Sequence, residues 1–203
     1  MAEAMSTPRP TSAAALGLAA FSLNLFLIAF SFTGVLSPAV VPVFLASGFF
    51  YGFVEILAGL HEYRIGSGYT GLVFASFGAF WMSTALLVLL QMAKILDFGG
   101  AAGQAMGLYF VAWTIFTAYL WVGSLYVNRI AFVVFTVLMV ALILFDLAEF
   151  GAISIVPGAW VGVLAALLAW YMSAALLLFE MTGRPILPFG PAVIRLTEAG
   201  TGS

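Results

Sequence analysis

The chain has 203 residues, of which 65% are hydrophobic and only 7% are charged, and its formal net charge at pH 7 is -2. Soluble domains carry about 25% charged residues, so this composition excludes a protein whose whole surface faces water and predicts one embedded in lipid. The chain has no cysteine, which excludes disulfides, thiolate metal ligands and cysteine nucleophiles. Its six lysine and arginine residues are scattered singly and form no nucleic-acid-binding patch.

Six apolar stretches are long enough to cross a membrane as helices, since about 20 residues span the roughly 30 Å of a bilayer core. Their hydrophobicity is continuous, whereas the strands of a membrane β-barrel alternate. The sequence therefore predicts an all-α polytopic membrane protein: a six-transmembrane-helix bundle over residues 13–181, with a flexible N-terminal tail (1–12) and a C-terminal tail (182–203). The expected spans are Ala13–Gly34, Val41–Leu60, Tyr69–Met92, Ala105–Val127, Ile130–Leu147 and Val156–Phe179.

The positive charges predict the orientation of these spans. With an even number of spans, both termini lie on one side of the membrane. The opposite side would hold a single cation, Lys94. Because positive charges accumulate on the cytoplasmic side, we expect both termini in the cytoplasm and the bundle in the cell (plasma or inner) membrane. The cations on the side of the termini are Arg9, Arg64, Arg129, Arg184 and Arg195.

Two phenylalanines within the spans have polar residues on or near their own helix face. Asn24 follows Phe21 by three positions in the first span, and Thr70 and Thr84 lie seven positions before and after Phe77 in the third. An apolar plug between hydroxyls suits a pathway that admits small polar molecules one at a time. Ordinary core packing would produce the same spacing, so both interpretations stay open.

Glu55 is the acid placed deepest within a span, where an ionisable side chain costs about 2.5–3.5 kcal/mol. Gly48, Gly52 and Gly59 lie on its helix face, and Glu62 follows seven positions later. This stripe of small residues predicts that another helix approaches closely, so that Glu55 faces protein. The carboxyl is then either a proton-coupling or gating group, or a neutral acid in a packing hydrogen bond.

Two further acids, Asp146 and Glu149, share a face near the end of the fifth span. Paired carboxylates can share protons, although acids at a helix end also simply reach interfacial water. With Glu55 and Glu62 they are the candidates for proton coupling. The lone histidine, His61, is expected in a wetted loop, and no metal site or cofactor is indicated. No lysine or arginine lies inside a span, so an acidic substrate must be held by neutral donors or helix N-termini, or must cross protonated.

Four short motifs follow one another along the chain. They are Leu16-Gly17-Leu18 in the first span, Phe50-Tyr51-Gly52 with Ala58-Gly59-Leu60-His61-Glu62-Tyr63 in the second, Ser76-Phe77-Gly78-Ala79-Phe80-Trp81 in the third, and Gly183-Arg184-Pro185-Ile186-Leu187-Pro188-Phe189-Gly190 after the sixth. In order and spacing these motifs resemble those of the microbial acetate uptake transporter (succinate–acetate permease) family. The resemblance covers about residues 16 to 190.

The resemblance implies six helices per protomer, a homo-hexamer with a separate path through each protomer, and proton-linked passage of acetate or succinate without nucleotide hydrolysis. The substrate path would run past Leu16, Gly17 and Leu18 and past the polar side chains of Asn24 and Thr84. A pore constriction of three side chains from the first, third and fifth helices is also implied, and matches Phe21, Phe77 and Val137.

The chain departs from the family pattern at four places. The family's Asn-Pro-Ala-Pro is replaced by Thr11-Ser12-Ala13-Ala14-Ala15, which leaves the choice of acid open. Phe77 replaces a tyrosine and so loses a hydroxyl, and Val137 replaces the larger leucine. Glu55 stands where the family commonly has glutamine, which adds a titratable group.

The main hypothesis is a channel or proton-coupled permease for short monocarboxylates, with succinate as a further substrate; its partners are a small carboxylic acid, protons and lipid. A neutral acid crosses apolar surroundings more cheaply than an anion, which favours passage with a proton. A channel for small neutral solutes (amide, urea, ammonia) stays open. So does a non-transporting sensor or scaffold organised by the pairs Gly48/Gly52 and Gly158/Gly162. An enzyme is not indicated, because no nucleophile–base pair or metal-ligand cluster appears.

Overall fold

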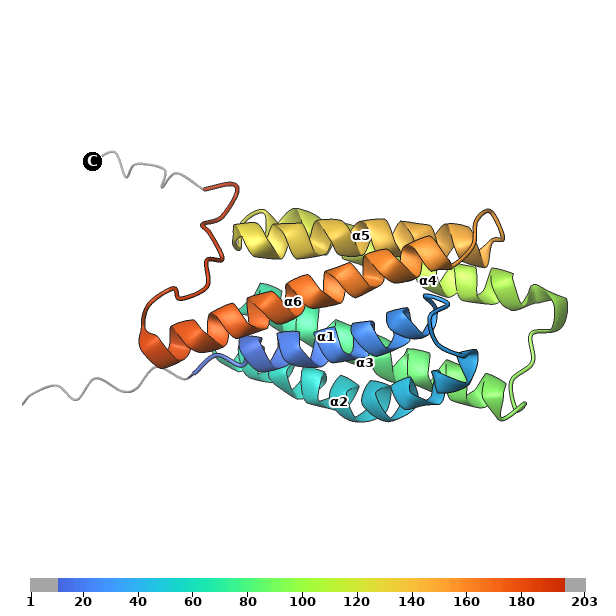
Figure 1. Cartoon of the computed structure of the whole chain (residues 1–203). Coiled ribbons are helices and arrows are strands. Elements are labelled where there is room, and N and C mark those ends of the chain that lie inside the picture. The colour runs from blue at the N-terminus through green and yellow to red at the C-terminus, as the bar shows by residue number, and fades with distance from the viewer. Residues whose placement is uncertain (1–10, 196–203) are drawn as a thin grey trace, which may run out of the picture.

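The computed structural model describes residues 11–195 and arranges them as six long helices that run up and down side by side (Figure 1). Every regular element within these residues is helical, and all six helices are long and apolar enough to cross a membrane. The predicted all-α six-helix bundle is therefore confirmed. The helices are α1 (Ala14–Ser31), α2 (Pro42–Arg64), α3 (Gly68–Met92), α4 (Ala102–Ser124), α5 (Arg129–Glu149) and α6 (Val156–Thr182).

The helices end within about one turn of the predicted spans. α2 begins at Pro42, whose fixed φ and missing N–H suit the first turn of a helix. It continues to Arg64, one turn beyond the predicted end, because no residue that breaks a helix comes before Gly66, which has a φ of +86°. α6 likewise continues to Thr182 and ends where Gly183 takes up the left-handed conformation with a φ of +66°.

The glycine stripe of α2 packs directly on α3. A Cβ added to Gly52 would lie 2.9 Å from the carbonyl oxygen of Gly78, and one added to Gly59 would meet the backbone of Ala75. The prediction that another helix approaches this stripe is confirmed, and the helix is α3. Glu55 lies on the same face and is fully buried, so the prediction that it faces protein is confirmed as well.

The glycines of α6 also serve packing within the chain. A Cβ on Gly162 would lie 3.0 Å from the Cβ of Ala29 in α1, and one on Gly158 would lie 3.0 Å from the ring of Phe145 in α5. α6 thus lies across α1 and beside α5 (Figure 1). Both glycine pairs of the scaffold hypothesis therefore join helices of one chain.

α4 lies at the edge of the bundle and meets α3 through large side chains. Its backbone packs against α5. Towards α3 the contacts are aromatic: the rings of Phe80 and Trp113 are 4.9 Å apart, and those of Phe77 and Phe116 are 6.3 Å apart, measured between centroids. Aromatic rings thus fill the space that separates these two helices.

The segment after α6 returns to the bundle, which differs from the expected tail. The carbonyl oxygen of Leu125, just past the end of α4, accepts hydrogen bonds from the N–H groups of Val193 and Ile194 at 2.9 and 3.0 Å. The N–H of Ile130, in the first turn of α5, donates to the carbonyl oxygen of Phe189 at 3.2 Å. Backbone groups at helix ends lack partners within their own helix, and this segment supplies them.

Both described ends of the chain lie at the same end of the bundle (Figure 1). Arg64, Arg129 and Arg184 adjoin helix ends on this side, and Lys94 follows α3 at the opposite end. Arg9 lies outside the described residues. The distribution of charge that predicts cytoplasmic termini is thus retained in the structure.

Candidate functional site

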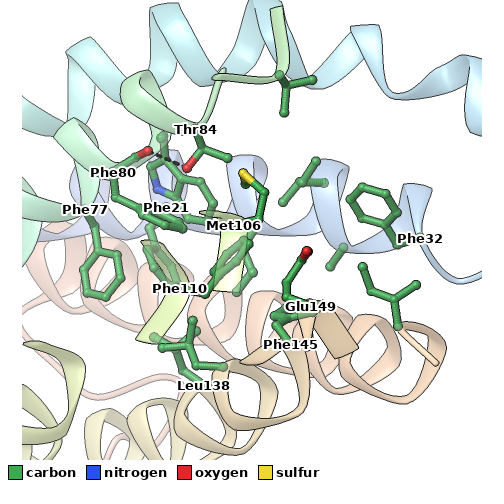
Figure 2. Close-up of a pocket in the computed structure, with 17 residues that line it drawn as sticks. Phe21, Phe32, Phe77, Phe80, Thr84, Met106, Phe110, Leu138, Phe145 and Glu149 are labelled. Atoms are coloured by element: carbon green, nitrogen blue, oxygen red, sulfur yellow. Dashed lines mark hydrogen bonds between the residues drawn. The ribbon is translucent and has the colours of Figure 1, made fainter. Parts of the chain in front are cut away.

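Two cavities enter the bundle from opposite ends. The proximal cavity, at the end that holds both termini, has a volume of about 240 Å³ and extends from Glu62 and Asn128 inward to Phe135. The distal cavity, at the other end, has a volume of about 100 Å³ and extends from Glu149 and Phe32 inward to Phe77 (Figure 2). A single water needs roughly 10–15 Å³ of such space, so both cavities have room for a solute of a few heavy atoms.

One layer of side chains separates the two cavities. On α1, Leu18 lines the proximal cavity and Phe21 the distal one; on α3, Phe74 lines the proximal cavity and Phe77 the distal one. Three residues of helix correspond to about 4.5 Å. The rings of Phe21 and Phe77 meet edge to face across the path, with centroids 5.2 Å apart and planes at 81°. We call this contact the seal.

The fifth helix meets the seal with residues other than Val137. Leu138 lines the distal cavity, and Val134 and Phe135 line the proximal one. Val137 is partly buried at the margin of the core and belongs to neither lining. The structure thus brings Phe21 and Phe77 together as the resemblance implies, and places Val137 beside the path. Its part in a constriction stays a prediction.

The hydroxyls expected on either side of Phe77 lie in the two cavities. Thr70 lines the proximal cavity and Thr84 the distal one. The Thr84 hydroxyl donates to the carbonyl oxygen of Phe80 at 2.7 Å (Figure 2) and lies 3.0 Å from the hydroxyl of Tyr109. Thr70 and Thr84 thus line the path on either side of Phe77, and the role of Phe77 as a plug stays a prediction.

The other residues expected along the path have varied positions. Leu18 lines the proximal cavity, whereas Leu16 is 50% exposed. Gly17 lies against the ring of Phe74, which a Cβ would approach to 2.6 Å. Asn24 is fully buried and accepts a hydrogen bond from the hydroxyl of Ser47 on α2, so it joins two helices and lines neither cavity.

Glu62 fastens the start of α1 at the mouth of the proximal cavity. Its side chain is 2% exposed, and its Oε1 accepts hydrogen bonds from the Ser12 hydroxyl at 2.8 Å and from the Ala13 N–H at 2.6 Å. The neighbouring His61 lies in the last turn of α2 and not in the predicted loop, because α2 continues to Arg64. Its Nε2 is bonded to the carbonyl oxygen of Thr11 at 2.8 Å. The two side chains hold the start of the described chain against α2.

Asp146 and Glu149 have separate surroundings although they end the same helix. Asp146 accepts a hydrogen bond from the Thr114 hydroxyl of α4 at 2.8 Å. Glu149 lines the distal cavity, and Figure 2 shows its carboxyl there. The structure therefore offers one acid at the distal mouth and one between α4 and α5. Within residues 11–195, no group of three acids or histidines could hold a metal ion.

The proximal cavity is bordered by three helix N-termini. The first turns or caps of α1, α3 and α5 contribute Ala14, Thr70 and Asn128 to its lining. A helix N-terminus carries about half a positive charge and directs unpaired N–H groups outward. The first turn of α3 has no side-chain cap. No lysine, arginine or histidine lines either described cavity. Glu62 and the Asn128 side chain already accept hydrogen bonds at the starts of α1 and α5, so the uncapped start of α3 is the positive potential that stays available to an anion.

Several wall residues gave no signal in the sequence. Phe110 and Met106 line the distal cavity and Phe135 the proximal one. In a chain that is 16% aromatic, such residues resemble any other apolar residue of a membrane helix. The one available signal is the spacing of four between Met106 and Phe110, which places both on one face of α4.

The chain is similar to known membrane proteins over nearly its whole length. Residues 2–186 match the GPR1/FUN34/yaaH family. The succinate-acetate/proton symporter SatP of Escherichia coli (strain K12) is 32% identical over 190 residues, which cover 92% of this chain and 98% of that protein. A solved structure of the bacterial acetate channel SatP has a TM-score of 0.81 at 30% identity and covers 89% of this chain and 99% of its own. The ammonia transport outward protein 2 of Saccharomyces cerevisiae is 29% identical over 80% of this chain and 60% of its own length.

Proposed function

The chain belongs to the GPR1/FUN34/yaaH family, and from that membership we propose that it conducts short monocarboxylic acids, above all acetate, across the membrane. It is a multi-pass membrane protein. The relatives named above are a succinate-acetate/proton symporter, an acetate channel and an ammonia transport protein, so the family is one of transporters and not of enzymes. Succinate is the further substrate that the proposal includes.

The observation that carries the proposal is the pair of cavities that meet at the seal inside a single chain. A solute that leaves the proximal cavity has to pass the rings of Phe21 and Phe77 to reach the distal one. The residues that line the two cavities are only three positions apart on α1 and on α3, about 4.5 Å along each helix, so the barrier is a single layer of side chains. A thin apolar barrier of this kind favours solutes that have a short apolar part and a single polar end.

The charges along this path favour passage of the acid together with a proton. The uncapped N-terminus of α3 attracts a carboxylate in the proximal cavity, whereas the acid Glu62 in the same lining opposes it. Beyond them, the distal cavity offers apolar walls, the Thr84 hydroxyl and the carboxyl of Glu149. Removing an anion from water without a paired charge is far more costly than removing the neutral acid, so crossing the seal as the neutral acid lowers the barrier.

Uptake of labelled acetate into proteoliposomes tests the function. We expect uptake above that of protein-free vesicles, and a faster rate when the outside is made acid. At pH values well above the pKa of the acid, each unit of acidification raises the neutral fraction about tenfold. Other short carboxylic acids should compete with the labelled acetate.

Protein-free vesicles under the same pH gradient are the control, because neutral acetic acid also diffuses through lipid. Absence of any acetate flux above this control, from protein shown to be folded, would contradict the proposal.

Light scattering on the same purified protein measures the number of copies in its oligomer. We propose a homo-hexamer, which the family resemblance implies; the large apolar side chains exposed on α2 and α4, such as Phe50 and Leu108, are free for contacts with lipid and with neighbouring copies.

A channel for small neutral or ammonium-derived solutes is the second candidate. Two observations favour it: the distal mouth carries an acid, Glu149, and the described cavities are lined by no cation. The similarity to a protein named for outward ammonia transport points the same way. Flux of urea, acetamide or methylammonium that carboxylates do not inhibit would favour this candidate over the acetate channel.

We also propose that both termini lie in the cytoplasm, which an accessibility experiment tests. The chain has no cysteine, so a single cysteine introduced at Gly100, between α3 and α4, reports one side of the membrane. In intact cells, a membrane-impermeant maleimide should label Gly100→Cys. It should leave the matched variant Gly68→Cys, at the start of α3, unlabelled until the cells are opened. The reverse pattern would overturn the proposed orientation.

A further inference from the structure

Two buried polar groups at the α2–α3 interface are neighbours without a hydrogen bond. Glu55 is fully buried, and neither of its carboxyl oxygens has a hydrogen-bond partner. The indole N–H of Trp81 on α3 is also buried and has no acceptor. Trp81 packs on α2 next to Glu55: a Cβ added to Gly52, one turn before Glu55, would lie 3.2 Å from the Cβ of Trp81. The indole N–H and the carboxyl nevertheless make no hydrogen bond. Buried polar groups are paired in the large majority of cases, so an unpaired donor beside an unpaired acceptor needs an explanation.

Glu55 lies at the depth of the seal. A Cβ on Gly78 would meet the backbone of Gly52 and Ile56, so the α2 residues on either side of Glu55 pack on the α3 residue that follows Phe77. A second buried donor without a partner, the amide nitrogen of Asn24, is too distant. Asn24 is bonded to Ser47, which is eight residues or about 12 Å along α2 from Glu55.

Trp81 connects this position to the seal. Its ring packs on Phe21 with centroids 5.6 Å apart and on Phe80 at 4.7 Å, and it lines the distal cavity. Phe21 in turn meets Phe77. Close-packed side chains transmit displacements because few voids can absorb them. A shift of the Trp81 indole towards α2 therefore frees space into which Phe21 can withdraw from Phe77.

We infer that Glu55 is a positioning residue for the seal: its carboxyl accepts a hydrogen bond from the Trp81 indole N–H when the seal opens. The structure holds the closed arrangement, in which the rings of Phe21 and Phe77 touch and the hydrogen bond is unmade. The open arrangement exchanges that ring contact for the hydrogen bond. This inference rests on the proposed function, since it assigns a role at the seal of the same path.

The test compares acetate influx into proteoliposomes for variants of this pair. Trp81→Phe removes the N–H and keeps an aromatic ring, and Glu55→Leu removes the acceptor. We expect each to lower the rate about tenfold, the change in population that a hydrogen bond of about 1.4 kcal/mol produces. The double variant should be no slower than the slower single variant. Glu55→Gln should retain the wild-type rate, because its amide oxygen can accept the same bond.

Trp170→Phe is the matched control, since Trp170 of α6 packs on Phe26 of α1 with centroids 5.3 Å apart and lines neither cavity; its rate should stay at the wild-type value. An unchanged rate in Trp81→Phe would overturn the inference, as would a hundredfold loss in the double variant or a Glu55→Gln rate as low as that of Glu55→Leu. Should Glu55→Leu fail to fold, Trp81→Phe decides alone. The wild-type rate tests the proposed function separately.

Discussion

Replacing Phe77 with alanine is expected to raise acetate flux severalfold and to admit longer acids that the native protein rejects. Phe77 provides one of the two rings in the single layer of side chains between the cavities. Removing its ring joins the proximal and distal cavities into one continuous path. Uptake of labelled acetate and butyrate into proteoliposomes measures both effects, and the ratio of the two rates reports selectivity.

The matched control for this variant is Phe26→Ala on α1. Phe26 stacks on Phe30 with centroids 5.4 Å apart and lines neither cavity. It therefore reports the general effect of deleting a packed ring, which costs about 3–5 kcal/mol in soluble cores. Both variants have to be shown folded before flux is compared. Phe77→Ala with native flux and native selectivity would refute the assigned role of the seal.

Replacing Gly59 with alanine is expected to lower the unfolding temperature by roughly 2–12 °C, and acetate flux with it. A Cβ at this position would meet the backbone of Ala75 and Gly71 on α3, which cannot move aside as a flexible side chain can. Overpacking costs about 1–3 kcal/mol, and about 1 kcal/mol corresponds to 2–4 °C in a chain of this size. Thermal unfolding in detergent measures the shift.

Gly68→Ala is the matched control, because the same change there adds a Cβ with no atom within 4 Å. Gly68 begins α3 and has no positive φ, so the alanine is compatible with its backbone. Its unfolding temperature should equal or slightly exceed that of the native protein. If Gly59→Ala were as stable as Gly68→Ala, the close approach of α2 and α3 would not limit the stability of the bundle.

Much of the fold could be predicted from the sequence because the solvent constrains it. In lipid a backbone must satisfy its own hydrogen bonds, so each long apolar stretch has to be a helix. The helix ends were predictable from the residues that stop a helix: α6 continues past the predicted end at Phe179 and stops at Thr182, just before Gly183. The burial of Glu55 was predictable for a similar reason, since a stripe of glycines on one helix face has to meet another backbone.

The candidate site was predictable only in part. Phe21 and Phe77 were identified from their motifs and polar neighbours, and their rings meet. On the fifth helix the sequence pointed to Val137, whereas Val134, Phe135 and Leu138 line the cavities. Successive residues are turned by about 100° around a helix, so an error of one position points a side chain away from the path. In a wholly apolar stretch, no polar residue shows which face of the helix points towards the path.

The sequence by itself determined the class of this protein, its number of helices and the positions of its buried acids, because hydropathy and helix periodicity are local properties. Only the tertiary structure decided which acid meets which partner: Glu62 caps α1, Asp146 bonds to Thr114, and Glu149 faces a cavity. The same holds for the return of residues 183–194 to the α4–α5 turn. These contacts join residues that are far apart in the chain. The sequence does not reveal which helices lie side by side, because that depends on how their side chains pack.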